Sequence, residues 1–155
     1  MTDNTKTPDN KVIQSLRQVL ADSYALLGQL HICHWNVEGP GFFALHQAFE
    51  EQYTELFSAI DEIAERIRAL GSYAPGGLGR LAGMAGFEEI EEGAADKQMV
   101  KSLLNQQSTL IDHLGQARDL AADTNDKETE DMMIARIQVH EKNSWMLSSY
   151  LKSSA

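Results

Sequence analysis

Hydrophobic residues recur along most of this chain with the period of an α-helix, about 3.6 residues. The first apolar stripe comprises Ile13, Leu16, Leu20, Leu27 and Leu30. His31 and His34 continue that stripe. Thr7 and Pro8 supply a helix cap and a first-turn proline, so a helix is expected from there to about Val37. No segment alternates with a sustained period of two, and the pattern therefore predicts an all-α fold.

A second helix is expected after the Glu-Gly-Pro-Gly sequence at residues 38–41, which interrupts the first pattern. The apolar period resumes at Phe42 and reaches Leu70 without a skipped turn, which predicts about 28 helical residues closed by Gly71. Seven of the eleven glycines lie between residues 71 and 93. This stretch predicts a crossover long enough to traverse a helix bundle, with a short helix at 78–85.

Two further helices are expected at residues 95–122 and 129–152, separated by the polar sequence 123–126. The residues expected to be buried are Met99, Leu103, Ile111, Leu114 and Leu120 on the third helix, and Met133, Ile137, Trp145 and Leu147 on the fourth. The chain has 155 residues, 43% of them hydrophobic, which suits one domain better than two. We expect a flexible tail at 1–9 and a single four-helix domain at 10–155.

Charge and cysteine content narrow the function classes. The net charge of -10 repels phosphate backbones, so nucleic acid is an unfavourable partner, and an acidic surface attracts cations besides keeping the protein soluble. The single cysteine, Cys33, cannot form an internal disulfide. Neither a signal peptide nor an apolar run of membrane-spanning length is expected, so a cytoplasmic location is predicted.

Five side chains of metal-binding type form the most informative pattern: His34, His46, Glu50, Asp61 and Glu65, spaced 12, 4, 11 and 4 residues apart. On the predicted second helix, both i,i+4 pairs lie on one face and can each chelate or share an ion. At about 100° per residue, the three carboxylates fall roughly 40° to 100° from His46, whereas the apolar stripe centres near about -60°. The candidate ligands therefore flank the core stripe.

The spacing also predicts that one chain cannot complete the site. Glu50 and Asp61 are separated by roughly 16 Å along a helix, so one ion cannot contact both on the same chain. Two antiparallel copies of the helix about a two-fold axis would bring the His46–Glu50 pair of one opposite the Asp61–Glu65 pair of the other. His34 would join from the first helix across the turn.

Mixed imidazole and carboxylate ligands suit iron better than magnesium, and the carboxylates favour ferric iron. Zinc and manganese remain alternative occupants. Each of the five residues taken alone is also typical of a solvated helix face or of the edge of a core. The set of five, with its two chelating pairs, is what indicates a metal site.

Three segments strongly resemble the Dps family, the DNA-binding proteins from starved cells. They read HWNVEGPGFFALH from His34 to His46, DEIAERIRALG from Asp61 to Gly71, and HEKNSWML from His140 to Leu147. The resemblance extends over nearly the whole chain and implies a ferritin-like four-helix bundle with a short helix in the crossover. It further implies a hollow cage of twelve subunits.

The resemblance implies a ferroxidase that binds Fe(II) between subunits, oxidises it preferentially with hydrogen peroxide, stores the ferric mineral and protects against oxidative stress. His34, His46, Asp61 and Glu65 match the family's ligand positions, while Glu50 stands where aspartate is usual. His31 is a candidate extra ligand. No histidine follows a glutamate by three positions, which separates this chain from ferritins with a di-iron site inside each bundle.

Two further expectations follow from the resemblance. Asp126 and Asp131, in an acidic stretch between the last two helices, match a region of acidic pores that admit iron. The tail carries only Lys6 and Lys11 against two aspartates, so direct DNA binding is not expected, although association with the nucleoid stays open. The alternative function is a cage that compacts DNA or binds another metal with little ferroxidase activity.

Overall fold

The computed structural model describes residues 10–152 and contains five α-helices and no strand in that range. They are α1 (Lys11–Asn36), α2 (Phe42–Ala69), α3 (Leu78–Ala85), α4 (Asp96–Asp123) and α5 (Lys127–Tyr150). The predicted tail at 1–9 lies outside the described residues. None of the described helices is long and apolar enough to cross a membrane. The predicted all-α fold is confirmed.

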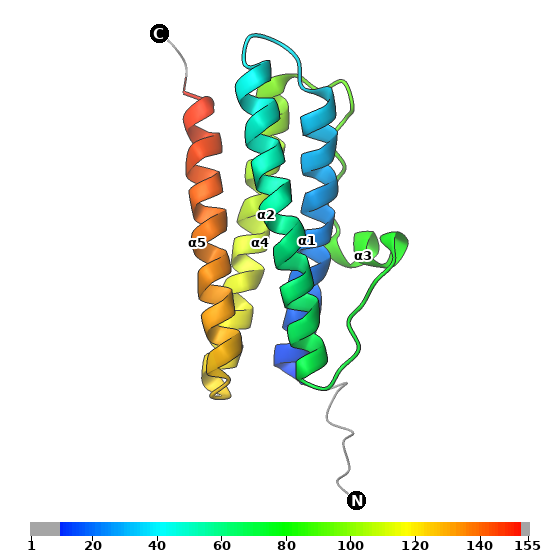
Figure 1. Ribbon diagram of the computed structural model, residues 1–155, viewed down its shortest axis with the longest axis vertical. Coiled ribbons are helices and arrows are strands. Elements are labelled where there is room, and N and C mark those ends of the chain that lie inside the picture. The colour runs from blue at the N-terminus through cyan, green and yellow to red at the C-terminus, as the bar shows by residue number, and fades with distance from the viewer. Residues whose placement is uncertain (1–9, 153–155) are drawn as a thin grey trace, which may run out of the picture.

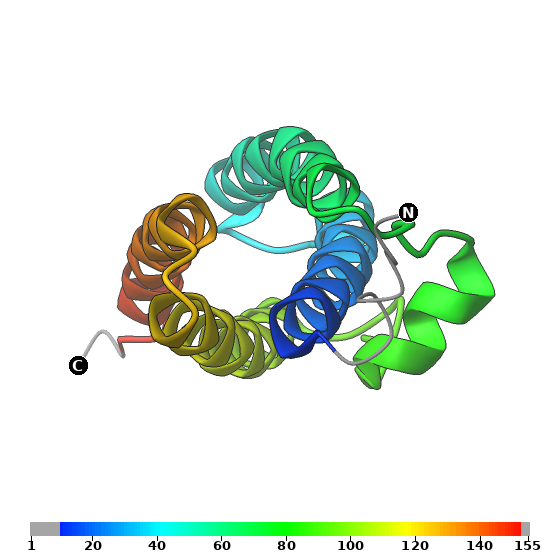
Figure 2. The same cartoon turned by 90° about the horizontal axis from the view of Figure 1, so that it is seen from below.

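The four long helices form a bundle, as the end-on view in Figure 2 shows. α1 and α5 run in one direction and α2 and α4 in the other, because the crossover after α2 returns along the bundle before α4 begins (Figure 1). α1 packs against α2 and α4, and α4 packs against α5. The short α3 lies outside the bundle beside α1, as expected for a helix within a crossover.

The helix ends follow local capping chemistry. α1 begins at Lys11, later than the Thr7–Pro8 start that the sequence indicated, because the Asn10 side chain accepts hydrogen bonds from the Val12 and Ile13 N–H groups at 3.0 and 3.2 Å. Thr7 and Pro8 themselves lie outside the described residues. α2 is followed by Gly71, whose φ of +95° suits glycine and ends the helix as predicted.

The core is formed by the apolar faces of the four long helices. Its largest fully buried side chains include Phe49, Leu16, Leu26, Ile63, Met99, Leu103 and Leu114. Three predictions of burial are only partly met, since Ile111, Leu120 and Ile137 are partly exposed. The prediction for Trp145 is wrong, because its side chain is 66% exposed. Trp145 precedes buried Leu147 by two residues, or about 200° around α5, and therefore faces away from the core.

Side chains of α1 hold the crossover against the bundle. Gln18 donates to the carbonyl oxygen of Met84 at 2.9 Å, and the side-chain oxygen of Gln29 accepts from the Ile90 N–H at 2.8 Å. These bonds satisfy backbone groups that a glycine-rich segment cannot pair internally. The crossover is therefore fixed on the α1 side, and the outer face of α2 remains uncovered by it.

Candidate metal centre

A tight turn brings the end of α1 against the start of α2. The Val37 N–H bonds to the Cys33 carbonyl oxygen at 3.0 Å and ends α1, and the Phe42 N–H bonds to the Gly39 carbonyl oxygen at 3.0 Å as α2 begins. Gly39 has a φ of +110°, a conformation that favours glycine. The turn reverses the chain within five residues, so side chains in the last turn of α1 meet those in the first turns of α2.

His34 and His46 are the pair that this turn brings together. Their rings stack with centroids 3.7 Å apart and planes 13° from parallel. The Nδ1 atom of His34 donates to the His46 carbonyl oxygen at 2.6 Å, and the Nδ1 atom of His46 donates to the His34 carbonyl oxygen at 2.6 Å. Each histidine thus fixes the ring of the other.

The reciprocal bonds decide which ring nitrogen of each histidine is left available to a metal ion. A carbonyl oxygen only accepts hydrogen bonds, so each Nδ1 must carry a proton, and in the neutral imidazole Nε2 then keeps its lone pair. Neither Nε2 atom has a hydrogen-bond partner among residues 10–152. Metal-binding histidines in proteins are commonly oriented in this way, with the second ring nitrogen bonded to a carbonyl. The pair is chemically prepared to donate two nitrogens to metal ions.

Aromatic rings surround the histidine pair. Phe42 stacks on His46 with centroids 4.9 Å apart, and Tyr53 lies edge-on to His34 at 5.2 Å. His31, the candidate extra ligand, stacks with Trp35 at 5.0 Å and meets Tyr53 edge-on at 4.5 Å. Partial burial lowers the pKa of His31, with a smaller contribution from His34, which favours the neutral ring that a ligand requires. A role for His31 as ligand remains a prediction.

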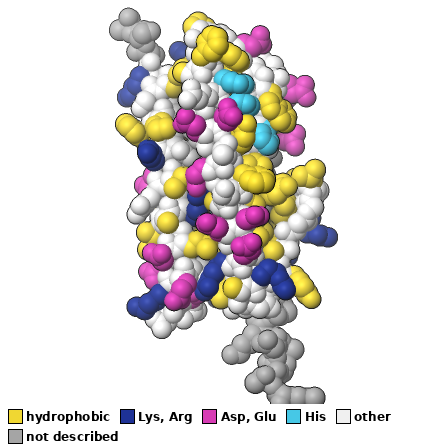
Figure 3. Space-filling view, in the orientation of Figure 1, with side chains coloured by type: hydrophobic (Ala, Val, Ile, Leu, Met, Phe, Trp, Pro, Cys, Tyr) yellow, Lys and Arg dark blue, Asp and Glu magenta, His cyan; other side chains and the backbone are white. Residues whose placement is uncertain are grey.

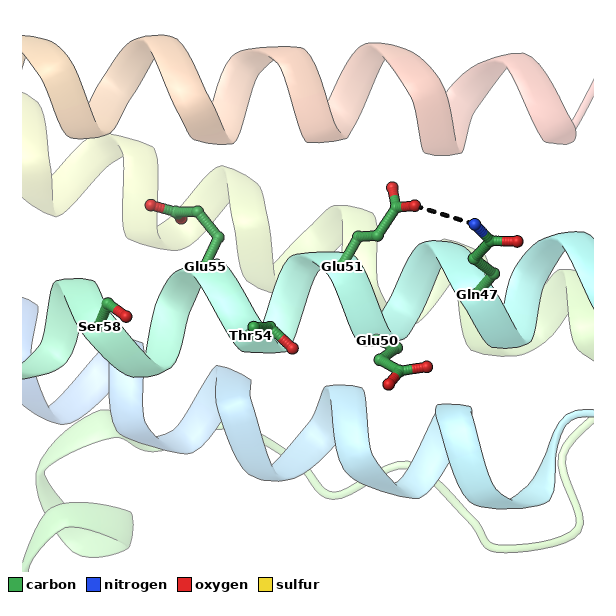
Figure 4. Close-up of a pocket in the computed structure, with 6 residues that line it drawn as sticks. All are labelled: Gln47, Glu50, Glu51, Thr54, Glu55 and Ser58. Carbon is green, nitrogen blue, oxygen red and sulfur yellow. Dashed lines mark hydrogen bonds between the residues drawn. The ribbon is translucent and has the colours of Figure 1, made fainter.

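The three candidate carboxylates, Glu50, Asp61 and Glu65, are all exposed on α2. None of them forms a hydrogen bond or ion pair with another described residue. In Figure 4 the Glu50 side chain points away from Glu51 and Glu55, which lie on the side of α2 that faces α5. Figure 3 shows histidines gathered near one end of this face and acidic side chains further along it. These carboxylates are free to bind a cation or a second molecule.

One chain does not assemble a complete metal site within its described part. Among residues 10–152, no group of three or more histidine, cysteine, aspartate or glutamate side chains is close enough to hold an ion. The chain brings together His34 and His46 but leaves Asp61 and Glu65 further along α2. That the second pair of ligands belongs to another copy, as the residue spacing indicates, stays a prediction.

The interior of the bundle holds a polar network in place of metal ligands. Buried Arg136 donates to Glu55 at 2.5 Å and to Nε2 of His140 at 2.9 Å, while Nδ1 of His140 donates to Gln107 at 2.6 Å. Gln107 donates in turn to Gln52 at 3.4 Å. Burial lowers the pKa of His140 to about 3, with a further contribution from the Arg136 charge. Both nitrogens of His140 are occupied, so it offers no ligand.

The two candidate pore residues have different surroundings. Asp126 caps α5, accepting from the Thr129 N–H at 3.1 Å, and pairs with Arg66 at 2.9 Å. Partial burial raises its pKa, but the bonds from Thr129 and the charge of Arg66 outweigh this and lower it overall. Asp131 is exposed, with no hydrogen bond or ion pair to another described residue. The assignment of both residues to a pore remains a prediction.

The sequence pattern did not reveal the rings around the histidines or the buried network. Phe42 precedes His46 by four residues, a spacing that places both side chains on one helix face and could have indicated their contact. Arg136 and His140 have the same spacing. Contacts between helices, such as Tyr53 with His34, carry no such local signal.

Known proteins resemble this chain over most of its length. Residues 13–154 match the ferritin-like domain family. The chain is 34% identical over 143 residues to "DNA protection during starvation protein 2" of Bacillus anthracis, covering 92% of this chain and 98% of the relative. The structure superposes on Dps from Staphylococcus aureus with a TM-score of 0.90 at 34% identity, covering 94% of this chain and 98% of the other.

A third similarity is to a solved Dps protein from Vibrio cholerae O1, described as a member of a broad superfamily of ferritin-like diiron-carboxylate proteins. The TM-score is 0.87 at 32% identity, with 92% of this chain and 89% of the other covered. The fold and the whole-length matches define a ferritin-like protein. Within that class, the chain belongs to the Dps family, as its motifs indicated.

Proposed function

We propose that this protein is a ferroxidase and iron-storage mini-ferritin that binds Fe(II) at sites shared between two subunits. The observation that carries the proposal is the His34–His46 pair, whose two Nε2 atoms are unpaired at one end of a face that also bears three unpaired carboxylates. Solved Dps proteins with the same fold include one described as a diiron-carboxylate protein, which supports iron as the substrate.

Sharing of the site follows from its dimensions. Asp61 lies 15 residues after His46 on the same straight helix, or roughly 22 Å away, which is too far for one ion. An antiparallel second copy of α2 would place the Asp61–Glu65 pair of one subunit opposite the His46–Glu50 pair of the other. The exposed apolar side chain of Phe57, 67% exposed between the two pairs, supports a contact with another copy at this place.

The nitrogen and oxygen ligands have different roles in the proposed reaction. The neutral imidazoles of His34 and His46 bind Fe(II), while the carboxylates of Glu50, Asp61 and Glu65 stabilise the harder Fe(III) product. Two Fe(II) ions give one electron each to hydrogen peroxide, whose O–O bond breaks, and two protons complete two water molecules. Because peroxide receives two electrons at one site, hydroxyl radicals are not released.

The ferric product is then stored in a closed shell. We propose that the shell has twelve subunits, and that Asp126 and Asp131 line acidic pores through which Fe(II) enters. Exposed Trp35 and Trp145, each 66% accessible in the isolated chain, support extensive burial of apolar surface on assembly. The alternative is a cage that compacts DNA or holds another metal with little ferroxidase activity.

Anaerobic loading of the assembled protein with Fe(II), followed by hydrogen peroxide, tests the proposal. We expect a rapid rise in ferric absorbance that is lost in a His34→Ala/His46→Ala variant. Glu62→Gln is the matched control, since Glu62 is an exposed carboxylate beside Asp61 that is outside the proposed ligand set. An unchanged rate in the histidine variant would show that the site assignment is wrong, and absence of oxidation in the unmodified protein would favour the alternative.

A further inference from the structure

The ring of Tyr53 on α2 contacts two histidines of α1 besides packing against the core. It lies on α2 seven residues after His46, or two turns, and is half-buried against the core. Its ring meets two histidines of α1, His31 at 4.5 Å and an angle of 61°, and His34 at 5.2 Å and an angle of 80°. Since His31 and His34 are three residues apart on one face of α1, the Tyr53 ring contacts both members of that face.

The contacts of the His34 ring with His46 prevent its rotation but still allow it to tilt about the hydrogen bond. Its Nδ1 bond and its stacking against His46 hold one edge and one face, and Tyr53 contacts another side. Edge-to-face contact with Tyr53 restricts that tilt, because aromatic rings prefer this geometry. His46 has a different ring contact, since Phe42 stacks on it with planes 25° from parallel.

The contact uses the ring of Tyr53 and not its hydroxyl. No hydrogen bond joins the Tyr53 hydroxyl to another residue between 10 and 152. A tyrosine retained only for packing on α1 could be replaced by leucine with little effect on the histidines. A ring that restrains an imidazole could not be replaced by leucine without an effect on that imidazole.

We propose that Tyr53 is a positioning residue of the metal centre, which rests on the proposed function: its ring holds the His34 imidazole in the orientation that presents Nε2 to the metal. Residues that orient metal-bound histidines from outside the ligand set change metal affinity by about 10–100-fold when replaced. Because Tyr53 acts through a ring contact, we expect the lower end of that range, about 10-fold.

The test is an anaerobic titration of the assembled protein with Co(II), whose visible absorption reports the geometry of its ligands. Tyr53→Leu is expected to weaken Co(II) binding about 10-fold and to change the absorption band. Tyr53→Phe, which keeps the ring, is expected to restore both. Tyr24→Leu is the control for loss of a tyrosine elsewhere, since Tyr24 lies on α1 ten residues, or roughly 15 Å, before His34. Tyr53→Met provides a second variant without a ring if the leucine variant does not fold.

The outcomes separate this inference from the proposed function. Co(II) binding by Tyr53→Leu and Tyr53→Met that equals the unmodified protein in affinity and band overturns the role of Tyr53 alone. Tyr53→Phe as weak as Tyr53→Leu overturns it as well, because the hydroxyl would then matter. Co(II) binding that survives in the His34→Ala/His46→Ala variant overturns both proposals, since the positioned histidine would not be a ligand.

Discussion

The Nδ1 atom of His34 lies 2.6 Å from the carbonyl oxygen of His46, and the Nδ1 atom of His46 lies 2.6 Å from the carbonyl oxygen of His34. The two bonds join α1 to α2 immediately beside the turn between them. They make the two imidazoles one unit, since neither ring can rotate without breaking a bond to the backbone of the other residue. Metal binding at either ring should therefore depend on both.

This dependence is measurable as a double-mutant cycle on Co(II) affinity. We expect the losses caused by His34→Ala and His46→Ala alone to sum to more than the loss in the double variant, with a coupling of about 0.5–3 kcal/mol. A cycle that pairs His34→Ala with His113→Ala is the control, since His113 bonds to Asp22 elsewhere in the bundle. Additive losses in the first cycle would contradict the idea of one unit.

Acid should weaken the fold through His140. Burial, with the Arg136 charge second, lowers its pKa from 6.5 to about 3, so below pH 6.5 the unfolded chain binds a proton that the folded chain does not. The free energy of unfolding therefore falls as the pH drops from 6.5 towards 3. At pH 5 this contribution is about 2 kcal/mol relative to pH 7.5.

Urea unfolding at pH 7.5 and pH 5, at one protein concentration, checks the contribution of His140. The His140→Gln variant lacks the titrating ring, so we expect its stability to fall less between the two pH values than that of the unmodified protein. Carboxylates such as Asp96 and Asp126 titrate in both proteins and cancel in the comparison. Equal losses would mean that His140 accepts a proton inside the folded bundle.

Gly41 is predicted to tolerate alanine poorly. A Cβ atom at Gly41 would lie against the Tyr150 hydroxyl and 3.0 Å from two ring carbons, closer than real contacts allow. Tyr150 would have to move and lose the hydrogen bond that its hydroxyl donates to Asp96, which costs about 1 kcal/mol. Thermal unfolding of Gly41→Ala measures this cost. In a Tyr150→Phe background, which already lacks the bond, the same substitution should cost clearly less.

Asp126 is predicted to stabilise the start of α5 whether or not it also serves a pore. Asp126→Ala removes the acceptor for the Thr129 N–H and the partner of Arg66, and we expect a loss of about 1–2 kcal/mol in unfolding free energy. Asp126→Asn keeps the capping oxygen and should recover most of that loss. An asparagine variant as unstable as the alanine variant would assign the stabilisation to the charge of Asp126 instead.

Direct DNA binding is predicted to be weak or absent at neutral pH. The chain carries a net charge of -10, and such a charge repels the phosphate backbone. We expect the purified protein to leave the mobility of plasmid DNA unchanged in about 0.15 M salt. Retarded plasmid under those conditions would support the DNA-compacting alternative, and its loss on removing residues 1–9 would assign the binding to the tail.

Much of the fold was predictable because its signals are local. The short helix at 78–85 was placed between glycines that interrupt helices on either side, and it has those bounds in the structure. The helix boundaries near Gly71 and at residues 38–41 likewise depend on residues within one turn of the boundary. Burial was less predictable, as Trp145 shows, because a hydrophobic side chain can also lie on the face of a helix opposite the core.

The sequence by itself determined the helices and the candidate ligands, and it predicts that a second chain completes the site, since residue spacing converts directly into angle and distance along a helix. Only the tertiary structure decided that His34 and His46 lock each other's rings, that Tyr53 contacts both His31 and His34, and that Arg136 and His140 occupy the bundle interior. These relationships depend on how helices rotate and pack against one another. Packing of that kind involves residues distant in sequence, and the periodicity of hydrophobic residues along one helix does not predict it.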